Sequence, residues 1–262
     1  MIAYGLTDRG CKREKNEDSI LLNDQINLYI VADGMGGHIL GEVASQTAVR
    51  VINEAIEKNI LNGDSLSLKK DEYIKEILTD ALAEANKEIY NYSQKLYEQA
   101  IMGTTVSAVL NRNEKIYIAH VGDSRIYRLR KSNLEKLTKD HNKAQELVDA
   151  GLLKEEEAEN HRSSHMLTRA IGSSDSVMPD ISVQNIINGD QLLLSTDGIF
   201  RVLNSDTVKD IMLKVIPLDQ KCKLLIDKTL EGGAPDNVSV IIVEPRPKGF
   251  LSRIFASTSL FQ

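Results

Sequence analysis

The sequence predicts an α+β protein that layers a largely antiparallel sheet against helices grouped in pairs. Several short apolar runs follow one another over loops too short for the crossover that parallel strands require. The runs with strand character are Ser19–Leu22, Leu28–Ala32, Thr104–Leu110, Lys115–Val121, Arg125–Leu129, Gln191–Ser195 and Val238–Val243. Asn23–Asn27 joins the first two as a hairpin loop, and Gly122–Ser124 joins another pair. These connections favour antiparallel layers over a doubly wound parallel sheet.

Four segments show the three-to-four-residue apolar spacing of amphipathic helices. In chain order they are 41–60, 71–98, Asp206–Val215 and Gln220–Leu230. Ser205 is the expected N-cap of the third helix, and Gly232–Gly233 closes the fourth. The stretch 142–160 predicts short helices around Gly151.

Domain organisation follows from the absence of any linker, repeat or change of composition before residue 244. We expect one catalytic domain over residues 1–245 and a C-terminal tail over 246–262. The tail combines basic with apolar residues, which favours a segment packed on the domain over a membrane or partner anchor.

Composition excludes several classes of protein. The 262 residues carry a net charge of −6, which disfavours a non-specific nucleic-acid binder, because such proteins need surplus Lys and Arg. The two cysteines, Cys11 and Cys222, lie far apart and predict neither a disulfide framework nor a zinc cluster. No apolar run approaches the roughly 20 residues of a membrane span, and the N-terminal segment lacks a secretory core. We therefore expect a cytoplasmic protein, and a monomer.

Aspartates stand at the ends of the predicted strands. Asp18 precedes the first strand of the hairpin and Asp33 follows the second, so both should lie at the same sheet edge. Asp197 ends one strand and Asp236 lies just before another, and the same reasoning brings them together if those strands pair. Asp123 lies in the turn of its own hairpin. Taken singly, each aspartate is more simply explained by turn chemistry.

Taken together, the aspartates predict a site for hard cations. Several carboxylates at one edge repel each other and raise their own pKa values unless a cation neutralises them. The donors are all oxygens, and no Cys or His set has metal-binding spacing, which favours more than one Mg²⁺ or Mn²⁺ ion. Gly34 directly follows Asp33 and would expose its carbonyl to an ion. Arg13 could clamp a phosphate with its planar fork, although for this residue taken alone a solvated surface charge is the favoured explanation.

Seven motifs in order extend these observations. They are Arg13-Glu-Lys-Asn-Glu-Asp18, Val31-Ala-Asp-Gly-Met-Gly-Gly-His38, Met102-Gly-Thr-Thr105, His120-Val-Gly-Asp-Ser-Arg125, Leu167-Thr-Arg-Ala-Ile-Gly172, Ser195-Thr-Asp-Gly198 and Asp236-Asn-Val-Ser239. Their order and spacing, from about residue 3 to 243, resemble the metal-dependent serine/threonine protein phosphatases of type 2C. The match is closest to the compact bacterial branch, whose members oppose serine/threonine kinases.

This resemblance implies two packed antiparallel β-sheets flanked by pairs of α-helices. It also implies a dinuclear Mn²⁺ or Mg²⁺ site in which Asp33 bridges two tightly bound ions and the Gly34 carbonyl binds one of them. Asp197 and Asp236 complete the pair and Asp18 lies beside it. Asp123 resembles the ligand of a weaker third ion, and Arg13 resembles the phosphate-binding arginine. Residues 140–165 correspond to a variable flap that tunes substrate choice.

One departure concerns the proton donor. Eukaryotic relatives carry a histidine directly after the Asp-Gly pair, where this chain has Met35. The bacterial form has a histidine slightly later, and His38 fills that position as a general acid, an orderer of waters or a structural residue of the glycine-rich turn.

The expected activity is hydrolysis of phosphoserine and phosphothreonine in proteins by a metal-activated water, with a cognate kinase as a partner. Two alternatives stay open: an inactive phosphoprotein-binding regulator of the same fold, and a phosphohydrolase for a small metabolite. A cysteine-dependent phosphatase is disfavoured, because no glycine-rich cradle follows Cys11.

Overall fold

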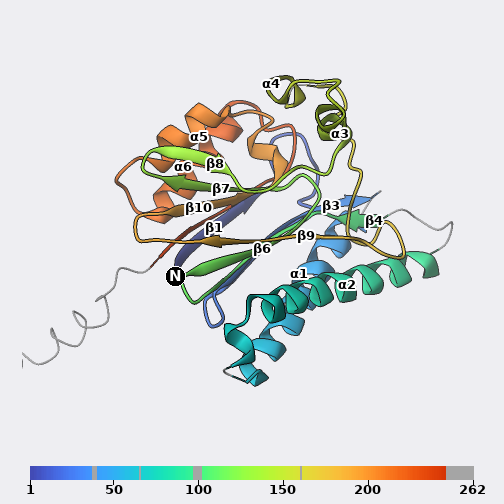
Figure 1. Ribbon diagram of the computed structural model, residues 1–262. Helices are drawn as coiled ribbons and strands as arrows, with labels where there is room; N and C mark the ends of the chain where they lie inside the picture. The colour runs from blue at the N-terminus through green and yellow to red at the C-terminus, as the bar shows by residue number, and fades with distance from the viewer. Residues whose placement is uncertain (37–39, 65, 97–101, 160, 246–262) are drawn as a thin grey trace, which may run out of the picture.

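Two antiparallel sheets pack face to face in the computed structural model, which describes residues 1–36, 40–64, 66–96, 102–159 and 161–245 (Figure 1). The first sheet has the order β1 (Ile2–Asp8), β11 (Val238–Glu244), β10 (Gln191–Ser195), β7 (Arg125–Arg130) and β8 (Asn133–Lys136). The second has the order β2 (Asp18–Asn23), β3 (Leu28–Gly36), β5 (Val106–Arg112), β6 (Lys115–Val121) and β9 (Asp180–Asn185), and β4 (Met102–Thr104) pairs with β3. The predicted antiparallel α+β class is confirmed, because all of these pairings are antiparallel.

Helices cover the outer faces of both sheets in pairs (Figure 1). The second sheet is covered by α1 (Leu40–Asn62) and α2 (Asp71–Lys95), and the first by α5 (Ser205–Met212) and α6 (Leu218–Glu231). The short helices α3 (Lys143–Asp149) and α4 (Glu155–Ala158) stand together at one end of the sandwich. The described residues also include two 3₁₀ helices, η1 (Ser67–Lys69) and η2 (Asp197–Ile199).

The core is built from the alternation of side chains along each strand. In β3, Tyr29 and Val31 point into the layer between the two sheets, whereas Ile30 packs beneath α1 and α2. All three side chains are fully buried. Three apolar layers therefore hold the sandwich together, one between the sheets and one beneath each helix pair.

Several elements differ from the sequence prediction. Strands β1, β8 and β9 were not predicted, and the run Thr104–Leu110 is two strands interrupted at Thr105. The N-cap of α5 is Asn204, whose side chain accepts from the Thr207 N–H, and not Ser205. Among the described helices, none is both long and apolar enough to cross a membrane.

Candidate active site

The hairpin of β2 and β3 brings two of the predicted aspartates together. Asp18 and Asp33 are directly paired in the register, as their positions at the strand ends require. The Asp18 carboxylate is buried, and its Oδ2 accepts from Thr196 Oγ1 at 2.8 Å and from Ser239 Oγ at 2.6 Å. Ser239 lies in β11 and Thr196 directly follows β10, so Asp18 joins the two sheets at this edge.

The backbone around Asp33 is fixed by two threonines. The Asp33 N–H donates to Thr105 Oγ1 at 2.9 Å, and the Asp33 carbonyl accepts from Thr104 Oγ1 at 2.9 Å. The next residue, Gly34, lies so close to the first turn of α1 that an added Cβ would stand 2.1 Å from the Gly41 carbonyl oxygen. Only glycine fits at position 34. This close contact holds the Asp33 side chain at the open end of the β2–β3 hairpin.

The neighbouring strands β10 and β11 bring Asp197 and Asp236 to the same edge. Their register pairs Ser195 with Val240, so the end of β10 lies beside the start of β11. At Gly198 an added Cβ would stand 1.9 Å from the Asn237 carbonyl oxygen, which keeps the two acidic turns in contact. The sequence prediction that these two aspartates become neighbours through paired strands is confirmed.

A cavity of about 350 Å³ collects most of the predicted site residues. Its lining consists of Arg13, Glu17, Asp33, Gly34, Met35, Gly36, Thr105, Asp123, His165, Leu167, Asp197, Arg201 and Asp236. Asp18 is not part of this lining and lies behind Asp33. His38 and the tail, 246–262, lie outside the described residues.

Two arginines neutralise part of the acidic charge. Arg13 Nη2 donates to Asp236 Oδ2 at 2.8 Å, and its side chain is half exposed. Arg201 donates to Asp197 Oδ2 through Nε at 2.9 Å and Nη2 at 2.5 Å, and its Nη2 also lies 3.6 Å from Asp236. Sequence reasoning missed Arg201, although an arginine four residues after an aspartate on a helical turn is a recognisable ion-pair spacing.

The loop that carries Arg13 is tied down by Asn237. The Asn237 side chain donates to the Arg9 and Lys15 carbonyls at 2.8 Å each, and it accepts from the Glu17 N–H at 2.8 Å. Asn237 directly follows Asp236, so one dipeptide positions both a carboxylate and the arginine loop above it.

Burial and mutual repulsion raise the pKa of several of these carboxyl groups. Burial, opposed by hydrogen bonds from Ser239 and Thr196, raises the pKa of Asp18 to about 7. The pKa of Asp33 lies well above its ordinary value because of burial and then the charges of Asp18 and Asp197, with Asp123 and Asp236 adding to them. Burial and the Asp197 charge likewise raise the pKa of Asp123. The cluster therefore favours any cation that can neutralise it.

The donor chemistry of this cluster fits a hard divalent cation. Asp18 Oδ1 and Asp197 Oδ1 are buried, and neither has a hydrogen-bond partner in the structure. As the side chains are placed, no three His, Cys, Asp or Glu of the described residues are arranged to hold one metal ion between them. Asp197 and Asp236 pair instead with Arg201 and Arg13. Lone carboxylate oxygens beside a glycine carbonyl are nevertheless the ligands that Mg²⁺ and Mn²⁺ prefer.

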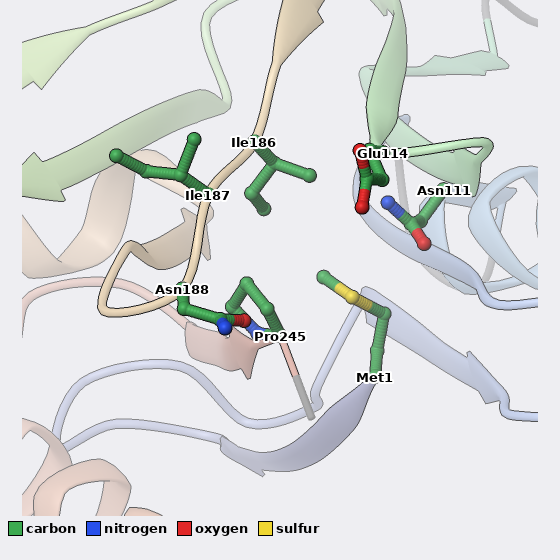
Figure 2. A pocket seen from close by; sticks show the side chains of 7 residues that line it. All are labelled: Met1, Asn111, Glu114, Ile186, Ile187, Asn188 and Pro245. Atoms are coloured by element: carbon green, nitrogen blue, oxygen red, sulfur yellow. The ribbon is translucent and has the colours of Figure 1, made fainter. Parts of the chain in front are cut away.

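A larger cavity of about 420 Å³ lies at the opposite end of the sandwich, beside the turn between β5 and β6 and the end of β11. Figure 2 shows the side chains that line it. It is lined by Met1, Asn111, Glu114, Ile186, Ile187, Asn188 and Pro245. Ile186 and Pro245 face it from two different loops, and Glu114 is its one acidic side chain. This cavity has none of the convergent acidic groups of the first one, so size alone does not locate the chemistry.

Comparisons with known proteins agree with the geometry. A family model described as protein phosphatase 2C matches residues 12–230. The serine/threonine phosphatase stp of Listeria welshimeri is 36% identical over 241 residues, which cover 91% of this chain and 93% of that protein. The structure of the Mycobacterium tuberculosis serine/threonine phosphatase PstP/Ppp superposes with a TM-score of 0.84 at 31% identity, covering 94% of this chain and 99% of the other. The PstP catalytic domain in complex with 2 manganese ions superposes with a TM-score of 0.78 at 32% identity, covering 93% of this chain and 97% of the other.

Proposed function

Because this chain belongs to the protein phosphatase 2C family of serine/threonine phosphatases, we infer that it hydrolyses phosphoserine and phosphothreonine at a site for two divalent cations. The observation that carries this inference is the convergence of Asp33, Asp123, Asp197 and Asp236 on one cavity with Arg13 at its rim. Asp33 and the Gly34 carbonyl would hold the ions together with Asp197 and Asp236. Asp18 would support Asp33 from behind, and Asp123 would hold a weaker third ion.

The chain's own residues have distinct tasks in this proposal. When bound, two hard cations lower the pKa of a water molecule and draw charge from phosphate oxygens. Arg13 exchanges its bond to Asp236 for a bidentate contact with the phosphate, for which its planar fork is suited. Arg201 keeps Asp197 and Asp236 oriented and adds a positive charge beside the phosphate. The role of His38 as a proton donor stays a prediction.

The wider setting is also part of the proposal. The catalytic unit would be residues 1–245, acting as a monomer, with a flap at about 140–165 beside the cavity and a tail at 246–262. The cognate partner would be a bacterial serine/threonine kinase, whose phosphorylated products this enzyme would dephosphorylate. Mn²⁺ or Mg²⁺ would serve as the ion, and PstP in complex with 2 manganese ions supports the first.

The decisive experiment measures hydrolysis of a phosphothreonine peptide with Mn²⁺ and with EDTA, alongside ion counts by calorimetry. Asp33→Asn should lose activity by about a thousandfold and bind fewer ions, because several kcal/mol of charge stabilisation disappear. Asp123→Asn should keep the tightly bound pair and still lose much of its activity. The control is Asp210→Asn on the exposed surface of α5, which should behave as wild type.

Three results would contradict the proposal. Wild-type turnover and ion stoichiometry in Asp33→Asn would show that the ion site is misplaced. Binding of the phosphopeptide without turnover would support the regulator instead. Faster turnover of nucleotides than of phosphopeptides would support the metabolite phosphohydrolase.

A further inference from the structure

Arg125 joins three parts of the molecule that are separate in sequence. It is the first residue of β7, two positions after Asp123, and its side chain is only 11% exposed. Its Nη2 donates to Asp140 Oδ2 at 2.9 Å, and its Nη1 donates to Glu159 Oε1 at 2.7 Å. The guanidinium carbon also lies 5.0 Å from the centre of the Phe200 ring. No step of the proposed chemistry uses this residue.

The Phe200 contact links Arg125 to the acidic turn of the active site. Phe200 ends the turn η2, and its N–H donates to the Asp197 carbonyl at 2.9 Å. Its ring stacks on Tyr127 with centroids 5.0 Å apart, so it cannot move without disturbing β7. A cation over an aromatic face is attracted by the ring, and more strongly where water is excluded. Arg125 therefore has a fixed position relative to Asp197.

The inner part of this cluster is a permanent anchor. Asp140 is 5% exposed and accepts both from Arg125 and from Lys136, whose Nζ lies 2.8 Å away. Burial alone would raise the pKa of Asp140, but the positive charges of Arg125 and Lys136 lower it below its ordinary value. Asp140 is therefore ionised. Removal of Asp140 would leave two buried cations without this carboxylate, which is strongly destabilising.

The outer part is a single ion pair. Glu159 lies directly after α4, its side chain is 38% exposed, and it uses the guanidinium nitrogen that Asp140 leaves free. A cavity of about 310 Å³ beside it is lined by Arg125 and Glu159 together with Asp123 and Asp197. Helix α4 thus stands at the rim of a hollow that continues into the active site, and this contact sets its distance from the carboxylates.

We propose that Arg125 is a positioning residue whose ion pair with Glu159 latches helix α4 at a fixed distance from the Asp197 turn, and so sets how well the enzyme uses protein substrates relative to small phosphate esters. This proposal rests on the proposed function. A small ester reaches only the carboxylate cavity, whereas a peptide must also lie against α4. The hydrogen bonds from Arg125 to Asp140 fix the guanidinium group, and its ion pair with Glu159 holds the end of α4 against it.

The test compares Glu159→Gln with Glu156→Gln, an exposed glutamate of the same helix. The first readout is the kcat/KM for a phosphothreonine peptide divided by that for p-nitrophenyl phosphate. Glu159→Gln should lower this ratio about threefold, the size expected for a half-exposed ion pair, mainly through the KM of the peptide. In 1 M salt the difference between Glu159→Gln and wild type should become smaller, because salt screens the ion pair that the wild-type protein still has. Glu156→Gln should leave the ratio unchanged.

The second readout needs no catalysis and separates this proposal from the proposed function. Trypsin can cut after Lys154 and after Arg162, which flank the latch. The native Glu159→Gln protein should be cut there faster than Glu156→Gln, whatever its activity. Equal cutting rates would overturn the latch even in an active phosphatase. Faster cutting with an unchanged substrate ratio would overturn its role in substrate choice.

Discussion

Arg13 and Arg201 differ in how firmly each is held. Arg201 is bound through two nitrogens to Asp197 and lies near Asp236, and these charges together raise its pKa above the ordinary value against the opposing effect of burial. Arg13 makes one ion pair from a half-exposed side chain. An exposed pair of this kind is worth little in water, so Arg13 can turn to a phosphate at small cost.

We expect Arg13→Ala to lower kcat/KM on a phosphopeptide by about 10- to 100-fold, the value of a hydrogen bond between charged groups. Metal affinity should stay near that of wild type or rise slightly, because a positive charge beside Asp236 is removed. Arg13→Lys should recover only part of the loss, since an ammonium lacks the bidentate fork. Unchanged kinetics in Arg13→Ala would show that Arg13 is a solvated surface charge and does not bind the phosphate.

Residue types at strand ends made much of the site predictable. The pairing of Asp18 with Asp33 follows from a hairpin whose first strand begins and whose second strand ends with an aspartate. The sequence analysis did not predict Arg201, because the turn that begins with η2 and contains this residue is too short to show apolar periodicity. The hydrogen bonds from Thr196 and Ser239 to Asp18 were not predictable for another reason, because they depend on how the two sheets pack.

At the scale of elements, the hairpin and α1 meet at a point with no spare volume. Gly34→Ala would place a Cβ 2.1 Å from the Gly41 carbonyl oxygen, so backbone of β3 or α1 must shift. We expect the melting temperature to fall by about 10 °C, as for other severe core clashes, and activity to fall with it. Gly151→Asn is the control, because an added Cβ at Gly151 meets nothing within 4 Å and its φ of 69° lies in the left-handed region that asparagine adopts more readily than other residues. Similar melting temperatures for both variants would contradict the tight contact.

The second sheet also contains a buried titratable group. His120 of β6 lies 2.9 Å from Ser107 Oγ through Nδ1, and its Nε2 donates to the Lys139 carbonyl at 3.0 Å. Burial, and then the neighbouring His141 ring, lower the pKa of His120 to about 4. The unfolded chain would take up a proton near pH 6.5, so the folded state binds fewer protons between these values.

The contribution of His120 to stability should therefore be complete above pH 6.5 and decline as the pH falls toward 4, by up to about 3 kcal/mol. The buried carboxyl groups of Asp18 and Asp33 have raised pKa values and act with the opposite sign, so the effect of His120 is measured as a difference between two proteins. In urea unfolding, the stability of wild type relative to His120→Asn should fall between pH 7.5 and pH 5, whereas its stability relative to His165→Asn, at an exposed histidine, should stay the same. A constant difference between wild type and His120→Asn would contradict this role of His120.

Long periodic helices and hairpins were predictable because their signals are local. Helix α1 extends one residue before and two after the predicted 41–60, and α6 covers the predicted Gln220–Leu230. Strands β1 and β9 were not predicted from the sequence, because their residues are mostly half-buried and show only a weak alternation of apolar and polar side chains. What stabilises them is a central neighbour, β11 or β6, that lies far away in sequence.

At the scale of the whole molecule, the active site and the end of β11 lie at opposite ends of the sandwich. Strand β11 begins next to Asp236 and runs for about 20 Å to Glu244, and Pro245 then lines the cavity of Figure 2. Truncation after Pro245 should therefore leave the kcat/KM on phosphopeptides within about twofold of wild type. The measurement pairs kinetics with a melting curve, and lost activity at an unchanged melting temperature would show that the tail acts in catalysis.

The position of β11 also affects the order in which the protein forms during synthesis. Of the strands in the described residues, β11 is the last in sequence, yet it lies between β1 and β10 inside the first sheet. Strand β1 is synthesised before all the other described strands and must wait more than 200 residues for its partner. Contacts so distant in sequence form slowly. The nascent chain therefore completes neither this sheet nor its acidic edge until translation has passed residue 244, and a prematurely terminated chain would be an inactive client for chaperones and proteases.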